Sequence, residues 1–182
     1  MSKVSSIISS QIGNLSKKEL EKLVLKAAAK DKAFHNHLLV NYFDKEFGEQ
    51  DLFEEAKTDL DHLTKKGYKG FSEELQLANM LGACSKRITE FSKNCKNKHL
   101  EADLIMHVLQ IPFSLSTNMF CTCFTAYNYK VVLLLKRLIS LVESRMHEDY
   151  KIQYQSKIND YLNILHRTSQ HLDYVYSLPK SI

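Results

Sequence analysis

The chain has 182 residues, which suits one domain, and its hydrophobic content of 44% and charged content of 25% are ordinary for a globular protein. Five glycines and two prolines are too few for the turns of a β-sandwich or barrel, so the composition favours helices. A net charge of +4 is too small to indicate nucleic-acid binding, and four cysteines without a C-x-x-C pair support neither a disulfide framework nor a structural zinc site.

The first predicted helix begins after Ser16, because Ser16 and Glu19 have the spacing of a capping box, in which each side chain satisfies a free backbone N–H. Apolar residues then recur at helical spacing, at Leu20, Leu23, Val24 and Ala27. Asp31 is expected to cap a second helix that ends near Gly48. A third helix is predicted from about Asp51.

The third helix is expected to stop at the Lys65-Lys66-Gly67 sequence, where cations meet the last carbonyls. The fourth begins after Ser72, a good N-cap followed by two glutamates. It carries a heptad-like apolar seam of Leu77, Leu81, Cys84, Ile88, Phe91 and Cys95. The seam fits a short coiled coil or a groove between two neighbouring helices, and its length favours the groove.

Pro112 is expected to terminate the fifth helix. From about Tyr127 to Met146 the chain reads as a helix that is apolar around most of its circumference, which is typical of a central helix. A last long helix is predicted from the apolar residues between Ile158 and Val175.

These elements predict an all-α fold with one helical domain over residues 1–182. Six or seven helices with short connections favour stacked antiparallel hairpins, either as an α–α superhelix of the tetratricopeptide or HEAT kind or as an irregular helical bundle. The sequence has no exact repeat.

The amino-terminal residues lack an apolar core of signal-peptide length, and the longest apolar run, Val131 to Leu135, is far too short to cross a bilayer. We therefore expect a cytoplasmic protein with reduced thiols and no membrane contact.

One row of polar residues has types that metals prefer. His99, Asp103 and His107 follow an i, i+4, i+8 spacing along the fifth helix. The two histidines are about 12 Å apart along the helix axis, so one ion cannot bind all three residues. Asp103 and His107 together, with ligands from another helix, are the candidate metal site. The alternative, which the sequence favours, is a polar stripe on a solvated face.

The segment that follows Pro112 is apolar where a polar connection is expected. It contains the candidate partner-binding residues Phe113, Met119, Phe120, Phe124 and Tyr127. The segment either lies in the core, which is the favoured interpretation, or lines a groove that receives a peptide or an apolar ligand.

The charges are unevenly distributed along the chain. Between Asp44 and Asp61 eight acidic residues face two lysines, a net of −6, and between Lys86 and Lys98 five basic residues face one glutamate, a net of +4. This polarity either orients a partner or a second copy of the chain, or is the solvated side of amphipathic helices. The basic stretch has no interleaved aromatics, so it is a poor nucleic-acid site.

Some segments are similar to a known family. Leu15 to Val24, L-S-K-K-E-L-E-K-L-V, resembles the opening of an uncharacterised bacterial family, a helical domain of unknown function. Glu90 to Lys93, the helix from Tyr127, and H-L-D-Y at His171 to Tyr174 lie where that family has similar segments. The resemblance implies an all-helical fold and no established activity. The apolar stretch Thr117 to Thr125 departs from the acidic residues of the family, which puts any shared role of this loop in doubt.

The sequence contains none of the common phosphate-binding, dinucleotide-binding, serine-hydrolase or zinc-protease motifs. The leading hypothesis is therefore a non-enzymatic helical scaffold, without a cofactor, that binds a protein or peptide, including a second copy of itself. The alternative is a helical metalloprotein or small hydrolase that uses Asp103 and His107. A third hypothesis is nucleic-acid binding through Lys86 to Lys98.

Overall fold

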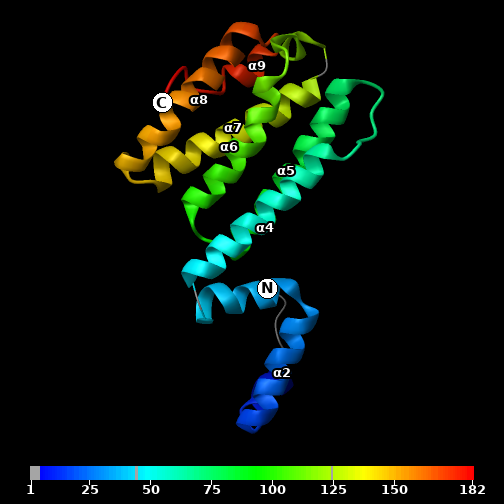
Figure 1. The fold of residues 1–182 in the computed structure, drawn as a ribbon, viewed down its shortest axis with the longest axis vertical. Helices are drawn as coiled ribbons and strands as arrows, with labels where there is room; N and C mark the ends of the chain where they lie inside the picture. The colour runs from blue at the N-terminus through cyan, green and yellow to red at the C-terminus, as the bar shows by residue number, and fades with distance from the viewer. Residues whose placement is uncertain (1–4, 44, 124) are drawn as a thin grey trace. The chain divides into compact units, whose positions relative to one another are not determined.

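The computed structural model consists of helices joined by turns (Figure 1). It describes residues 5–43, 45–123 and 125–182, and within residues 6, 7, 9 and 45–47 it describes the backbone only. The described residues contain no strand, so the predicted all-α class is confirmed.

The chain forms two compact units, an N-terminal unit (Met1–Glu49) and a C-terminal unit (Gln50–Ile182). A compact unit is defined by its contacts, whereas a domain is defined by its ability to fold alone. One domain over residues 1–182 therefore stays a prediction.

The N-terminal unit is a succession of short helices, in order α1 (Ser6–Ile12), α2 (Lys17–Lys30), α3 (Lys32–Leu38), the π-helical turn η1 (Leu39–Phe43) and the start of α4 (Lys45–Lys65). The predicted capping box opens α2, since the Glu19 N–H donates to Ser16 Oγ at 3.4 Å and the Ser16 N–H donates to Glu19 Oε2 at 2.8 Å. Asp31 caps α3 as predicted and accepts hydrogen bonds from the N–H groups of Ala33 and Phe34.

The predicted helix boundary near Gly48 is wrong. The structure ends α3 at Leu38, and Gly48 lies inside α4, which begins at Lys45 rather than near Asp51. A glycine inside a helix costs only about 1 kcal/mol relative to alanine, so local packing can override it. Gly48 is buried, and its backbone lies close to Leu39 and Val40 of η1.

The C-terminal unit contains the rest of α4, α5 (Glu73–Asn94), α6 (Lys98–Ser114), the 3₁₀ turn η2 (Thr117–Cys121), α7 (Thr125–Arg145), α8 (Glu148–Thr168) and α9 (Leu172–Val175). As predicted, α4 stops at Lys65, and Ser72 caps α5 by accepting a hydrogen bond from the Leu75 N–H at 3.3 Å. Connections of two or three residues join α5 to α6 and α7 to α8, which gives successive helical hairpins.

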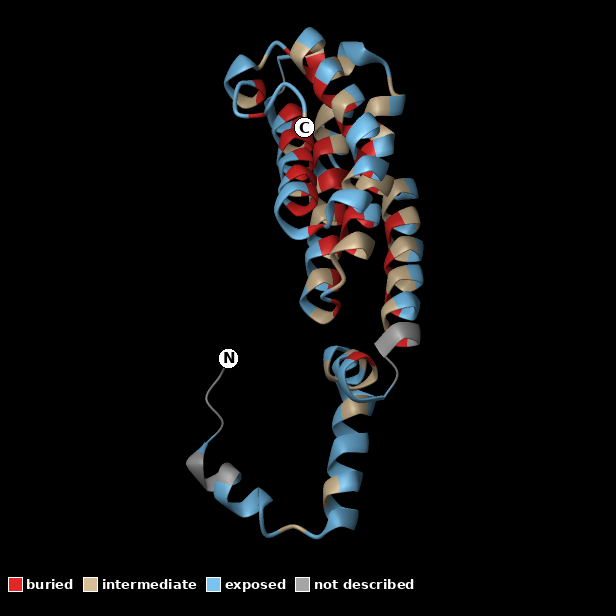
Figure 2. Ribbon diagram, turned by 90° about the vertical axis from the view of Figure 1, so that its left-hand side faces the viewer, coloured by how far each residue is buried: buried red, intermediate tan, exposed pale blue. Residues whose placement is uncertain are grey.

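Helix α7 is the centre of the C-terminal unit, as its apolar circumference predicts. It packs against α5, α6, α8 and α9. The side chains of Val131, Leu135, Leu138 and Val142 are fully buried, and Figure 2 shows the buried residues gathered between the helices of this unit. Neither α7 nor another helix within the described ranges is long and apolar enough to cross a membrane.

The apolar seam of α5 lies in the core. Leu81, Cys84, Ile88 and Cys95 are fully buried and Phe91 is 2% exposed, while Leu77 at the start of the seam is half-buried. Because α5 contacts both α6 and α7, the seam packs into a groove between two helices, which was the favoured interpretation.

Two further predicted boundaries are wrong. Helix α6 continues past Pro112 to Ser114, because a proline near the end of a helix removes only one hydrogen bond and Pro112 is itself buried by packing. The last long helix is divided into α8 and α9. Between them Ser169 is buried, and its hydroxyl donates to buried Asn128 on α7 at 2.9 Å.

A buried carboxylate connects helices α5, α6 and α7. The Glu101 side chain on α6 is 5% exposed, and one of its oxygens accepts from both Nε and Nη2 of Arg137 on α7, at 3.1 and 2.7 Å. The other oxygen accepts from Lys98 Nζ at 2.7 Å. Arg137 also donates to the hydroxyls of Thr89 and Ser92 on α5.

Burial by itself raises the pKa of the Glu101 carboxyl, but the hydrogen bonds and charges of Lys98 and Arg137 outweigh it and hold the pKa below its usual value. Glu101 is therefore ionised at neutral pH. The group of Glu101, Arg137, Lys98, Thr89 and Ser92, here named the Glu101 cluster, fixes how α5, α6 and α7 align.

Truncation of the central helix tests this packing. We expect Leu135→Ala to lower the free energy of unfolding by about 2–5 kcal/mol, because it removes buried methyl groups and leaves a cavity. Leu133→Ala on the same helix, where the side chain is 42% exposed, is the matched control and should change it by less than about 0.5 kcal/mol. Equal losses in urea denaturation would contradict the central position of α7.

The Glu101 cluster makes a separate prediction. Arg137→Met should cost up to about 3 kcal/mol of unfolding free energy, because it leaves the buried carboxylate with Lys98 as its main partner. The double variant Glu101→Met with Arg137→Met should lose less than the single variant, since no uncompensated charge remains. A double variant that is less stable than Arg137→Met would show that the charges are not coupled.

Candidate functional site

The polar row on α6 does not converge on one point. The His99 ring lies against the Tyr150 ring of α8, with centroids 4.1 Å apart. Asp103 accepts a hydrogen bond from the Tyr154 hydroxyl of α8 at 2.7 Å. His107 faces the other way and donates from Nε2 to Asp61 Oδ1 of α4 at 2.7 Å. His99 and Asp103 therefore both face α8, whereas His107 faces α4.

The Asp103 and Tyr154 pair is a structural hydrogen bond. Burial of Tyr154 raises the pKa of its phenol, and the bond to the Asp103 carboxylate raises it further. The hydroxyl therefore stays protonated and acts as a donor. The Asp103 carboxylate therefore bonds to α8, whereas the hydrogen bond of His107 goes to Asp61 of α4.

The Asp61 and His107 pair lies in a cleft of about 350 Å³ between α4 and α6 that also includes Thr64, Gln110 and Ser114. A carboxylate that orients an imidazole is an arrangement suited to proton transfer. The hydroxyls beside it are engaged elsewhere, however. Ser114 Oγ donates to the Ile111 carbonyl at 2.9 Å and Thr64 Oγ1 donates to the Asp61 carbonyl at 3.0 Å. The cleft therefore shows an imidazole oriented by a carboxylate without an aligned nucleophile.

Metal binding by Asp103 and His107 stays a prediction. In the part of the chain that the structure describes, no group of three or more histidine, cysteine, aspartate or glutamate side chains is placed to hold an ion. His107 and Asp61 together provide two ligand atoms of the kinds that zinc accepts. The sequence could not identify Asp61 as the partner of His107, because the two residues are 46 positions apart.

Two aromatic residues of the segment after Pro112 lie in the core. Phe120 and Tyr127 are fully buried, with ring centroids 5.5 Å apart, and partner binding by this segment stays a prediction. Burial also raises the pKa of the Tyr127 phenol, with a smaller contribution from Glu73. Met119 is half-buried, and the predicted partner-binding residue Phe124 lies outside the described residues.

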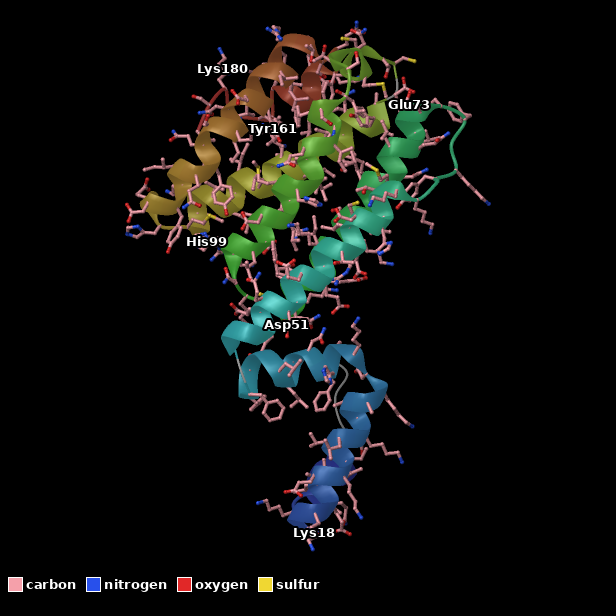
Figure 3. All side chains as sticks on the ribbon, viewed as in Figure 1. Lys18, Asp51, Glu73, His99, Tyr161 and Lys180 are labelled. Carbon is pink, nitrogen blue, oxygen red and sulfur yellow. The ribbon has the colours of Figure 1, made fainter. Side chains whose placement is uncertain are left out.

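Among the candidates of this segment that the structure describes, Phe113 lies at a surface depression. Its ring is half-buried and stacks on Tyr161 of α8, with centroids 3.9 Å apart and an angle of 9° between the ring planes. Tyr161 is labelled in Figure 3, on the helix that follows α7. The depression has a volume of about 840 Å³, and its lining consists of Phe113, Lys157, Asp160, Tyr161, Asn163, Ile164, His166 and Arg167.

The cysteines show no sign of reactive chemistry. Cys84 and Cys95 are fully buried, and burial raises the pKa of the Cys84 thiol to about 11. The Cys121 thiol donates to the Thr168 carbonyl at 3.0 Å, which connects η2 to the end of α8. All four cysteines are free thiols.

The basic stretch from Lys86 to Lys98 is partly neutralised by the fold. Arg87 Nε donates to Asp59 Oδ2 at 2.7 Å, and Lys98 pairs with Glu101 at the same distance. Two of the five basic residues are therefore committed to ion pairs, which weakens the stretch as a phosphate-binding surface.

Sequence reasoning missed the Glu101 cluster. The i, i+3 spacing of Lys98 and Glu101 was visible in the sequence, but such pairs are common on solvated helices. Arg137 follows 36 residues later, and only the packing of α6 on α7 brings its guanidinium to the carboxylate.

The chain matches no protein-family model, and no curated protein or solved structure is similar to it. The resemblance to an uncharacterised helical bacterial family therefore stays a prediction.

A double-mutant cycle tests which partner His107 has. We expect Asp61→Asn and His107→Gln to be coupled by about 0.2–1 kcal/mol in unfolding free energy, the usual range for a partly exposed pair. Asp103→Asn and His107→Gln should be additive within about 0.5 kcal/mol. Coupling in the second cycle and none in the first would restore Asp103 and His107 as the interacting pair.

Proposed function

We propose that this protein is a non-enzymatic helical scaffold that binds another protein through helix α2. The observation that carries the proposal is that α2 is amphipathic and contains no buried residue. Leu23 is 51% exposed and Val24 is 39% exposed, although their spacing is that of a helix face that packs. Figure 2 shows that α2, labelled in Figure 1, is mostly exposed, whereas the helices of the C-terminal unit contain many buried residues.

The stripe on α2, made of Leu20, Leu23, Val24 and Ala27, has a physical reason to be covered. An isolated helix of 14 residues is marginally stable in water, so most of its stability has to come from packing of its apolar face. Covering apolar surface gains about 25 cal/mol per Å². A partner that covers the stripe therefore stabilises both the helix and the complex.

The charge of α2 supports a partner with an acidic surface. The helix carries five lysines and two glutamates, a net of +3. The protein's own sequence contains an acidic stretch, since residues 44–61 have a net charge of −6, of which Asp59 and Asp61 are paired with Arg87 and His107. Opposite charges steer association and set its orientation. Self-association, with a second copy as the acidic partner, is accordingly the first form of binding that we propose.

A helical metalloprotein or small hydrolase is the second candidate, and the oriented imidazole of His107 is what favours it. Metal analysis of protein purified without an affinity tag separates the two. Stoichiometric zinc, iron or manganese that is lost in His107→Gln would favour the metalloprotein.

Substitution within α2 tests the scaffold. We expect Leu23→Glu to abolish self-association, because it places a charge in the apolar stripe. The mass measured by size-exclusion chromatography with light scattering should then no longer rise with concentration. Capture of partners from lysate should be lost as well. Leu25→Glu is the matched control. Leu25 is 70% exposed and lies two residues further on, so it faces a different side of the helix. A strictly monomeric protein that captures nothing, or equal effects of both variants, would refute the proposal.

A further inference from the structure

The depression along α8 places an aromatic ring beside exposed cations. Phe113 is stacked on Tyr161, which is 3% exposed, so the Phe113 ring is supported from one side by the core. Phe113 also lies 5.5 Å from buried Phe120, between ring centroids. An aromatic or large aliphatic side chain placed against this ring gains both buried area and ring contact.

The charged residues of the depression are available to a ligand. Lys157 Nζ lies over the Tyr161 ring, 5.7 Å from its centre, in a cation–π contact. Neither Lys157 nor Arg167 forms an ion pair with another residue in the described ranges. Asp160 is the single acid of the lining, so the depression carries a net charge of +1 with His166 neutral.

The polar groups of the lining suit a peptide backbone. His166 Nε2 lies 3.0 Å from the Pro179 carbonyl oxygen, which only accepts, so Nε2 carries the hydrogen and Nδ1 of the neutral ring is an acceptor. The Asn163 amide offers both a donor and an acceptor. Together they match the alternating N–H and C=O groups of an extended chain.

We propose that this depression binds an acidic peptide segment that carries an aromatic or large apolar side chain. The apolar side chain covers Phe113, and the flanking carboxylates pair with Lys157 and Arg167. The volume of about 840 Å³ lies within the range of about 300–1,000 Å³ that ligand sites occupy. This inference goes beyond the proposed function, since it assigns a ligand class to a surface other than α2.

A single-stranded nucleic acid fits the depression less well. Such ligands need a continuous cationic track and several exposed rings on which successive bases stack. The depression has one half-buried phenyl ring, that of Phe113, and two formal cations, and Asp160 would lie close to a phosphate chain.

Fluorescence anisotropy on the full chain tests the inference, with fluorescein-labelled Glu-Glu-Phe-Glu-Glu as the probe. Three labelled ligands serve for comparison: the same peptide with alanine in place of phenylalanine, its lysine counterpart, and a ten-nucleotide oligo-dT. We expect the first peptide to bind more tightly than all three. The double variant Lys157→Ala with Arg167→Ala should weaken it by about tenfold, since two ion pairs are lost.

Asp160→Asn is expected to change the affinity for the peptide in the opposite direction. It removes a repulsive charge without changing the shape of the lining, so binding should tighten by about two- to threefold. Lys136→Ala, an exposed lysine of α7 outside the depression, is the control and should leave binding unchanged. These surface substitutions should also leave the circular dichroism spectrum and the unfolding midpoint unchanged.

Three results would overturn the inference: no binding of the acidic phenylalanine peptide, equal binding of the acidic and basic peptides, or tighter binding of oligo-dT. If partners are captured through α2 while the peptide does not bind, this inference fails and the proposed scaffold function stands. If the peptide binds and Leu23→Glu has no effect on capture or mass, the role of α2 fails instead.

Discussion

The need to cover the wide apolar face of helix α7 constrains the C-terminal unit most strongly. Leu135 and Leu138 on this face are fully buried, and α7 packs against four other helices. One amphipathic helix can cover only one stripe, so α5, α6, α8 and α9 are all needed around it. The hydrophobic effect brings these helices together without fixing how far each slides along α7.

Hydrogen bonds and ion pairs, which are directional, fix the alignment of the helices that the hydrophobic effect does not determine. The carboxylate of Glu101 accepts hydrogen bonds from α7 and from its own helix, and Arg137 reaches on to two hydroxyls of α5. A slide of one helix turn would leave a charge buried without a partner, at a cost of several kcal/mol. The polar row of α6 has a similar role at lower energy, because His107 and Asp103 each bond to a different neighbouring helix.

The surfaces left over are the ones to which we assign binding. The stripe of α2 and the depression beside Phe113 both combine apolar side chains with lysine or arginine, and neither includes a member of the Glu101 cluster. The oriented imidazole of His107 differs from both, because proton transfer needs a nucleophile or a substrate group aligned with it.

The sequence by itself determined the local features of this protein. The capping box at Ser16, the caps at Asp31 and Ser72, the all-α class and the central position of α7 follow from interactions within a few residues or from the periodicity of one helix. The boundaries predicted at Gly48 and Pro112 are wrong because the helix-breaking preference of each residue costs little enough for packing to override it. Only the tertiary structure paired Asp61 with His107 and Glu101 with Arg137, and it alone placed Phe113 on Tyr161. The two residues of each pair are more than thirty positions apart in the sequence. The periodicity of a helix shows which of its faces is apolar, but it does not show which other helix will cover that face.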